Sequence, residues 1–447
     1  TAGDNTAIGT NALCSNTTGC INVAVGEDAM KANTTGEFNA AMGSGAMQTN
    51  TTGGENTGSG YNALALNTTG CKNSAFGKSS LESNTTADCN TAVGYNALKA
   101  NTTGTENVAV GSGALDSNTT AGCNTSIGHG SMGDNTEGAN NAAVGRSALG
   151  SNTTGTSNVA MGRNSLTLNT TATGNTATGA FSLNANTTGA TNVGVGWQAL
   201  TANTTGASNT AVGALALLAN TTGVQNTAVG KGSLDSVTTA NNNTAIGEGS
   251  GSGITTGAGN TTMGYSAGSQ ITDGSCNILI GYNAQLSSNS TNRIGLGNGI
   301  SVSANDQFRF GQGSTDVVFN QFATNASFTR VSDQRTKKEI NTNEDLGLNF
   351  INDLRTVTYK KRAPSELPET FKDYNSNITE PKHKEKLYGM IAQEVKEALD
   401  KNNITDFGGW VEDEDSGLQA ISQEMFIYPL IKAVQELSAR VKELEDE

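Results

Sequence analysis

The fold is decided by a stretch that the chain repeats with few changes, Asn90-Thr-Ala-Val-Gly94-Tyr-Asn-Ala97-Leu98-Lys-Ala-Asn101-Thr-Thr-Gly104-Thr-Glu106. Asparagine recurs at every seventeenth position from Asn5 to Asn277, and glycine follows four places later each time, from Gly9 to Gly281. Each unit holds two short apolar clusters, one before that glycine and one at Ala97-Leu98. The clusters predict two short strands per unit.

A repeat unit of this length is too short for a pair of helices, and Gly, Asn and Thr at this density oppose helix. We therefore predict a mainly β fold in which residues 1–290 form a parallel β-solenoid of about 17 coils. Glycine suits a backbone with positive φ after the first strand, and the repeated Asn would stack into an amide ladder. At about 4.8 Å per strand, the rod would be roughly 80 Å long. Small residues such as Ala12 and Ala29 leave a thin core, so we expect association, most simply three-fold.

Composition and charge exclude several classes of protein. The chain is only 35% hydrophobic, which is low for a conventional globular core. No run of about 18 apolar residues exists and the start shows no signal segment, so we expect no membrane insertion. The net charge of −14 argues against nucleic acid as a partner, because phosphate binding needs clustered Lys and Arg. Residues 1–290 carry 7 Lys/Arg and 14 Asp/Glu.

Candidate chemistry in the solenoid is sparse. The six cysteines lack the CxxC spacing that metal sites favour, and turn positions explain them better than a disulfide framework, although Cys71 and Cys89 lie one coil apart. The acidic residues show no paired recurrence of the kind that a glycosidase needs. His129 is expected at the surface of a turn. We predict neither a metal nor a cofactor.

The composition changes at Arg330–Ile340, and all four prolines follow this border. Short alternating runs predict a β-rich neck over residues 291–332. In the small α+β domain expected over 333–447, we predict a helix over 344–354 and a strand over 356–360. The stretch from Tyr388 to Leu399 is expected to run from Gly389 into another helix. Apolar residues near the end of the chain step by 4, 3, 4 and 3, which predicts a short coiled coil. They are Leu430, Val434, Leu437, Val441 and Leu444.

The repeat resembles the heads of trimeric autotransporter adhesins of the YadA type. Asn22-Val-Ala-Val-Gly26 and Asn243-Thr-Ala-Ile-Gly247 carry the likeness, and the unit here is longer by the Asn-Thr-Thr-Gly insertion. The resemblance implies a left-handed parallel β-roll in a trimer.

The last part resembles the self-cleaving intramolecular chaperone of phage endosialidases and tail fibres. The likeness rests on Ser332-Asp333-Gln-Arg335-Thr-Lys337-Lys-Glu-Ile340, then Tyr388-Gly389-Met-Ile391-Ala392-Gln393-Glu-Val395, then the terminal heptads. In that family the C-terminal domain holds three chains in register while the preceding β-structure folds, and the Ser–Asp bond is then cut.

Carried over to this sequence, the resemblance implies that Ser332 is the nucleophile and Lys337 the general base of a single-turnover serine endopeptidase. The cut would fall between Ser332 and Asp333, with Arg335, Gly389 and Gln393 as supporting motif residues. A desolvated lysine held neutral can activate a serine hydroxyl. Residues five apart on a regular helix lie about 140° from each other, so either the segment is a loop or the lysine comes from another subunit.

These observations predict a homotrimeric fibre, most simply a viral tail fibre that is extracellular and contacts a host receptor or glycan. Registering three repetitive chains is degenerate, because a slip of one repeat unit keeps the pattern, and a terminal clamp removes that ambiguity. The alternatives are a cellular surface adhesin with the same repeat and a polysaccharide depolymerase, which would need a carboxylate pair in a groove.

Overall fold

The structure is a computed structural model, and it describes residues 3–286, 291–313, 316–321, 329–330, 334, 338–368, 374–381, 385–412 and 419–446. The chain divides into two compact units, Thr1–Ser332 and Asp333–Glu447. Each unit has its own hydrophobic core.

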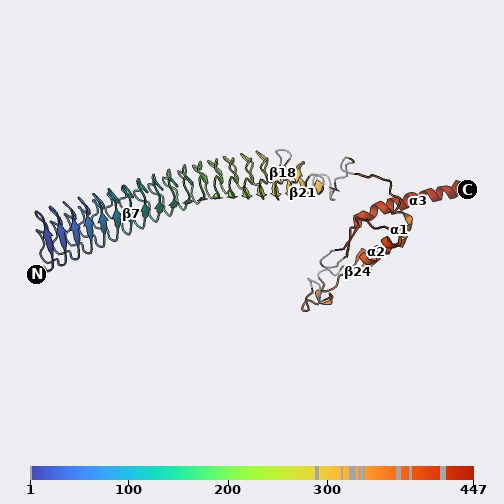
Figure 1. Cartoon of the computed structure of the whole chain (residues 1–447), viewed down its shortest axis with the longest axis horizontal. Coiled ribbons are helices and arrows are strands. Elements are labelled where there is room, and N and C mark those ends of the chain that lie inside the picture. Colours follow the sequence, from blue (N-terminus) through green and yellow to red (C-terminus); the bar gives the residue numbers. More distant parts are fainter. Residues whose placement is uncertain are drawn as a thin grey trace. The chain divides into compact units, whose positions relative to one another are not determined.

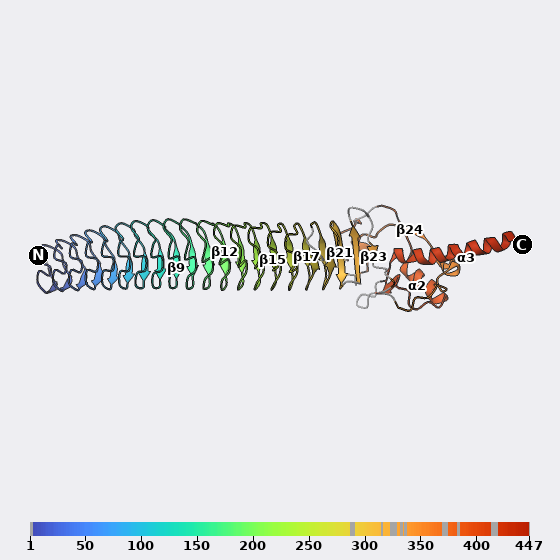
Figure 2. The ribbon, with the colours of Figure 1, turned by 90° about the horizontal axis from the view of Figure 1, so that it is seen from above.

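The first unit is a β-solenoid with one three-residue strand in each coil (Figure 1). Successive strands β1–β17 pair in parallel, and each residue lies beside its equivalent in the next coil, as Thr91 does beside Val108. Figure 2 shows these strands side by side along one face of the stack. The predicted parallel solenoid is therefore confirmed. The strands are β1 Thr6–Ile8, β2 Val23–Val25, β3 Ala40–Met42, β4 Thr57–Ser59, β5 Ser74–Phe76, β6 Thr91–Val93, β7 Val108–Val110, β8 Thr125–Ile127, β9 Ala142–Val144, β10 Val159–Met161, β11 Thr176–Thr178, β12 Val193–Val195, β13 Thr210–Val212, β14 Thr227–Val229, β15 Thr244–Ile246, β16 Thr261–Met263 and β17 Ile278–Ile280.

The repeated glycine and asparagine fix the geometry of the coil. Gly94 has a φ of 138°, and a Cβ there would lie 2.5 Å from the carbonyl oxygen of Gly111 in the next coil. The Asn90 side chain accepts a hydrogen bond from the Asn107 amide (3.0 Å) and donates one to the Gly104 carbonyl (2.9 Å). These contacts recur along the rod and confirm the predicted amide ladder. They satisfy backbone groups that would otherwise be buried without partners.

The second apolar cluster does not form a strand, and that prediction is wrong. Leu98 has a φ of 53°, which is left-handed and incompatible with a strand. Its amide still bonds to the next coil, at the carbonyl of Ala114 (2.9 Å). Together with Ala92 and Ala97, Leu98 is fully buried, so the cluster supplies the thin core from a turn.

Coils near the end of the rod exchange one core residue for another. Gly251 replaces the core leucine, and Ile254 replaces the asparagine of the Asn-Thr-Thr-Gly turn. A Cβ on Gly251 would lie 3.2 Å from the Cδ1 atom of Ile254, so the isoleucine fills the space that the leucine leaves. The next coil repeats the exchange with Gly268 and Ile271. The fold is retained because the isoleucine supplies an apolar side chain as large as that of the lost leucine.

Beyond the rod, the main sheet continues through β19 Ile294–Leu296 and β21 Gln307–Gln312. Two antiparallel strands follow, β22 Asp316–Gln321 and β23 Thr329–Arg330. A separate two-stranded parallel sheet is formed by β18 Gln285–Leu286 and β20 Ser301–Val302. The described residues of 291–332 are thus rich in strand.

The second unit is small and mixed α+β. Its elements are α1 Leu348–Asp353, β24 Val357–Tyr359, η2 Pro364–Glu366, β25 Leu387–Gly389, α2 Ala392–Lys401, β26 Trp410–Glu412, β27 Gln419–Ile421, η3 Gln423–Phe426 and α3 Ile427–Asp446. Phe350, Phe407 and Phe426 pack together in its core. The helix expected after Gly389 is confirmed as α2, and residues 387–389 before it pair with β24 as a strand.

Candidate functional site

The predicted scission point coincides with the division between the two compact units, which falls between Ser332 and Asp333. Ser332, Asp333, Arg335 and Lys337 lie outside the described residues, so their geometry stays a prediction. Just after them, Lys338 is exposed and pairs with Glu339 (3.4 Å).

Gly389 lies in β25, where its missing side chain makes room for two others. A Cβ there would lie 3.3 Å from Cε1 of Tyr359 and 3.6 Å from Nε2 of Gln423. The strand pair β24–β25 lines a hollow of about 590 Å³ together with Met390 and Gln423. The glycine of the motif is therefore a packing residue of this hairpin, and Tyr359 is the neighbour that requires it.

Gln393 lies in the first turn of α2 and is exposed. The buried side of that helix is formed by Val395, Ala398 and Leu399, which face the aromatic core. The two motif residues Gly389 and Gln393 thus do not share a buried site.

Helix α3 leaves its heptad residues uncovered. It buries Pro429 and Ala433, while the α3 seam, Leu430, Val434, Leu437, Val441 and Leu444, is 48–68% exposed. The predicted terminal helix is confirmed. An apolar seam of this length on an exposed helix marks an interaction surface.

A contact that the sequence did not predict joins helices α1 and α3 of the second unit. The amide of Leu348, at the start of α1, donates to the Glu436 carboxylate of α3 (2.7 Å). A carboxylate stabilises a helix start because the first amides have no partner within the helix. Only the three-dimensional structure could show it, since the residues are 88 positions apart.

Residues 332–404 match the family model of the chaperone of endosialidase. The matched range begins at Ser332 and includes Lys337, Gly389 and Gln393. The match confirms the resemblance to the chaperone of endosialidase over these residues, which apart from Ser332 belong to the second unit. We call the second unit, residues 333–447, the chaperone domain. No curated protein and no solved structure matches the chain.

Two ion pairs brace α2 of the chaperone domain. Arg355 bonds to Glu394 through Nε (3.0 Å) and a second nitrogen, and this hydrogen bonding lowers the pKa of Glu394. Lys401 bonds to Asp353 (2.5 Å), and Asn402 adds a second bond to the same carboxylate (2.9 Å). The lysine bond is the main reason that the pKa of Asp353 is lowered.

Other kinds of site are not evident in the described part of the chain. It holds no cluster of three or more His, Cys, Asp and Glu side chains that could bind a metal ion. Within the same residues, no helix is both long and apolar enough to cross a bilayer. All six cysteines are free thiols that are partly or well exposed.

Proposed function

We propose that three copies of this chain form a fibre whose chaperone domain sets the register of the β-solenoid and is then released by autoproteolysis at Ser332-Asp333. The observation that carries the proposal is the exposed α3 seam, which lies in the same unit as the residues that match the chaperone of endosialidase. A heptad seam of this kind is covered by copies of the same helix in coiled coils.

A second apolar surface runs along the rod and supports association of identical chains. The third residue of most strands is a large apolar side chain that is exposed. These residues are Ile8, Met42, Phe76, Val93, Ile127, Met161, Val212, Val229, Ile246, Met263 and Ile280. A partner that covers this stripe along its whole length must share the period of the repeat. Another copy of the rod has that period.

Register explains why the fibre needs a chaperone. Every strand pair from β1 to β17 uses the same offset of one repeat unit and nearly the same side chains. Two rods displaced by one coil therefore make almost the same contacts, and the energy difference is too small to select one alignment. The chaperone domain has a unique core and a single seam. Assembly at the C-terminal end would fix the alignment before the rods associate.

The proposed cleavage follows ordinary acyl-transfer chemistry. The Ser332 hydroxyl loses its proton to a neutral Lys337 amine and attacks the carbonyl carbon of the Ser332-Asp333 peptide bond. The C–N bond breaks, and the Asp333 amine takes a proton and leaves. Water then hydrolyses the ester and leaves a carboxylate on Ser332. Burial of the lysine in the assembled fibre would keep its amine neutral.

Attack between chains is less strained than attack within one chain. A serine that attacks its own carbonyl carbon closes a four-membered ring, whereas Ser332 of a neighbouring chain reaches the same carbon without one. Assembly would then start the cleavage, because the nucleophile and the bond meet only in the trimer. This arrangement times the release of the chaperone domain.

Denaturing gels with mass spectrometry test the cleavage. The wild-type chain is expected to yield residues 1–332 and 333–447, while Ser332→Ala and Lys337→Ala stay whole. A tagged Ser332→Ala chain co-expressed with wild type should be cut if attack occurs between chains, and an intact tagged chain would contradict that step. A wild-type chain that stays intact after assembly would refute autoproteolysis altogether.

The setting that we propose is the tail fibre of a virus, displayed outside the host cell and in contact with its surface. The support is the combination of a long periodic rod with a chaperone domain of the endosialidase kind. Localisation of the chain by antibody labelling in electron micrographs distinguishes a virion appendage from a cellular adhesin.

A further inference from the structure

One position of the coil collects the aromatic and basic residues of the rod. When the repeated Asn is numbered as position one of the coil, position six is the residue directly after the repeated glycine. It holds five of the eight aromatic residues of 1–290, namely Tyr61, Tyr95, Trp197, Tyr265 and Tyr282. It also holds four of the seven Lys/Arg residues and the one histidine of this range, namely Lys78, His129, Arg146, Arg163 and Lys231. If the aromatic and basic residues were spread evenly over the positions of the coil, about one of them would fall at position six.

The aromatic side chains of this row are exposed, and two groups within the row have members that contact one another. The five aromatic residues are 51–58% exposed. Tyr265 and Tyr282 stack with ring centroids 5.3 Å apart, and the ammonium of Lys78 lies 5.8 Å from the ring of Tyr61 and 5.9 Å from that of Tyr95. Exposed aromatic residues in such a row are costly in water unless a ligand covers them.

Three of the position-six cations lack an ion pair in the part of the chain that the structure describes, and one of them, Arg163, lies over the ring of Phe181 (4.7 Å). Within the described residues, no carboxylate lies within 4.0 Å of Lys78, Arg146 or Arg163, whereas Lys31 and Lys99 elsewhere on the coil pair with acidic neighbours. Residues 1–290 have twice as many acidic as basic residues. A row of cations without carboxylate partners on an acidic rod therefore marks a place where an anion is attracted.

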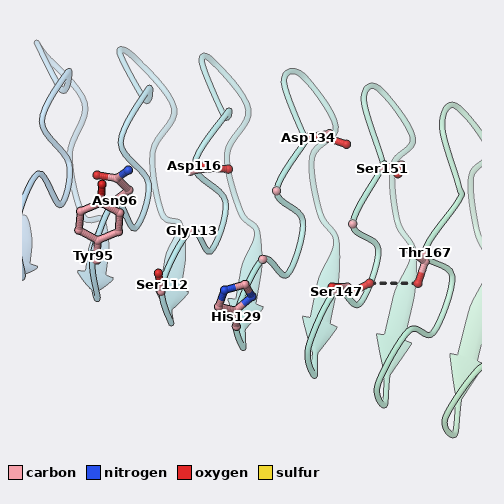
Figure 3. Close-up of a pocket in the computed structure, with 13 residues that line it drawn as sticks. Tyr95, Asn96, Ser112, Gly113, Asp116, His129, Asp134, Ser147, Ser151 and Thr167 are labelled. Atoms are coloured by element: carbon pink, nitrogen blue, oxygen red, sulfur yellow. Dashed lines mark hydrogen bonds between the residues drawn. The ribbon is translucent and has the colours of Figure 1, made fainter.

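Beside position six lies a groove of about 440 Å³ that extends over several coils. Glycines open it, because Gly113 and Gly130 stand where Asn96 stands in another coil, and Gly133 and Gly150 stand where Lys99 does. Figure 3 shows Tyr95, Ser112 and His129 at the ends of successive strands, with Asp116 and Asp134 across from them.

The lining of the groove is polar and rich in hydroxyl groups. Ser112, Ser147, Ser151 and Thr167 contribute hydroxyls. Asp116 is half-buried, and its burial raises the pKa of its carboxyl. Groups of this kind hydrogen-bond to the hydroxyls of a sugar, whereas pockets for drug-like ligands are mostly apolar.

We propose that position six and the groove beside it bind an acidic glycan that runs along the rod. Its sugar rings pack on Tyr95 and the other aromatic side chains of the row, its carboxylate or sulfate groups pair with Arg146 and Arg163, and its hydroxyls bond to Asp116 and Asp134. A polymer suits this surface because both repeat along one direction. The proposal rests on the rod of the proposed fibre and requires neither the chaperone domain nor the cleavage.

Biolayer interferometry of the full chain tests the proposal, with immobilised alginate as a uronate polymer, heparin as a sulfated polymer and dextran as a neutral one. We expect binding to at least one acidic polymer and none to dextran. The double variant Arg146→Ala/Arg163→Ala should weaken binding about tenfold or more, because two charge-assisted contacts are lost. Gly133→Gln should weaken it similarly by filling the groove. A Cβ at Gly133 has its nearest neighbour at 3.6 Å, so the fold accepts this change.

Two control variants make the same kind of substitution outside the proposed binding surface. Lys72→Ala removes a cation at another position of the coil, and Ser252→Gln places glutamine at the same coil position as Gly133 but far along the rod. Both should bind as wild type does. Light scattering on the same samples separates loss of binding from loss of the trimer. The proposal is wrong if the wild type retains no acidic polymer, if dextran binds equally, if the groove variants bind normally, or if the arginine variant changes the mass of the assembly.

Discussion

The two units of this protein encode their structures in opposite ways. The rod is stabilised by contacts between neighbouring coils that are nearly the same at every step, such as the Asn90–Asn107 ladder. The chaperone domain depends on contacts that occur once, between residues far apart in sequence, such as Leu348 with Glu436. Repetition specifies a shape but no alignment, whereas a unique core specifies both.

Removal of residues 333–447 should have the largest effect, because it removes the only non-repeating unit. The shortened chain is expected to keep its β-structure but to assemble in several registers and lose the single trimeric mass. Circular dichroism and multi-angle light scattering measure these two properties. As a milder change, Leu437→Glu places a charge in the α3 seam and should also abolish the trimer, while Ala439→Glu on the outer side should not. A homogeneous trimer from residues 1–332 alone would show that the rod sets its own register.

Truncation of the aromatic core should unfold the chaperone domain as a whole. Phe350 is fully buried between Phe407 and Phe426, with ring centroids 6.0 Å and 6.3 Å away. Phe350→Ala is expected to cost about 3–5 kcal/mol of the free energy of unfolding. Tyr388→Ala, at a side chain 73% exposed, should change it by less than about 0.5 kcal/mol. Urea unfolding in a Trp197→Phe background, followed by the fluorescence of Trp410, measures both changes, and equal effects would contradict a single core.

In the rod, a comparable defect should stay within a few coils. A Cβ on Gly247 would lie 2.6 Å from the Gly264 carbonyl oxygen, and its φ is 125°, so Gly247→Ala meets both strain and a clash. Gly249→Ala in the same coil meets only strain, since its nearest neighbour is the Ser266 hydroxyl at 3.5 Å. We expect a cost of about 3 kcal/mol for the first and about 1 kcal/mol for the second. Hydrogen exchange should show faster opening near the altered coil only, and loss of protection over the whole rod would contradict nearest-neighbour stability.

The sequence predicted the rod well because the same residue pattern recurs in every coil. Seventeen occurrences of Asn and Gly at fixed spacing identify a backbone that one unit alone would not. The sequence did not predict the turn at Leu98, because leucine rarely adopts positive φ and only the stacked coil imposes it. The row at position six can be found in the sequence when the coils are aligned by their repeated Asn. Counts of charged and aromatic residues over the whole rod do not reveal it.

The chaperone domain was less predictable from its sequence. The helical periodicity of α3 was visible, yet the strand at residues 387–389 was not predicted, because a three-residue strand leaves too short a pattern. The bond from Leu348 to Glu436 depends on the tertiary fold alone. Of the expected site, Gly389 and Gln393 are placed, and Ser332 and Lys337 rest on the family motif.

Acid should act on the two units with opposite sign, although the effects are small. In the chaperone domain the pKa values of Asp353 and Glu394 are lowered by their bonds to Lys401 and Arg355, so these groups stabilise the fold above their ordinary pKa values of 3.8 and 4.5. That stabilisation is lost as the pH falls below about 4.5 and through the lowered folded-state pKa values. In the rod, burial raises the pKa of Asp116 and Asp235, so protonation relieves a cost as the pH falls through their raised pKa values toward the ordinary value of 3.8.

Each unit contains one tryptophan, Trp197 in the rod and Trp410 in the chaperone domain, so fluorescence can follow the two separately. In a Trp197→Phe chain, the unfolding midpoint reported by Trp410 should fall between pH 6 and pH 3.5, and Glu394→Gln should make this dependence shallower because one of the two titrating groups is removed. In a Trp410→Phe chain, the midpoint reported by Trp197 should fall less or rise. Parallel curves for the two reporters would mean that the units unfold together, and would remove the contrast between local and unique stabilisation.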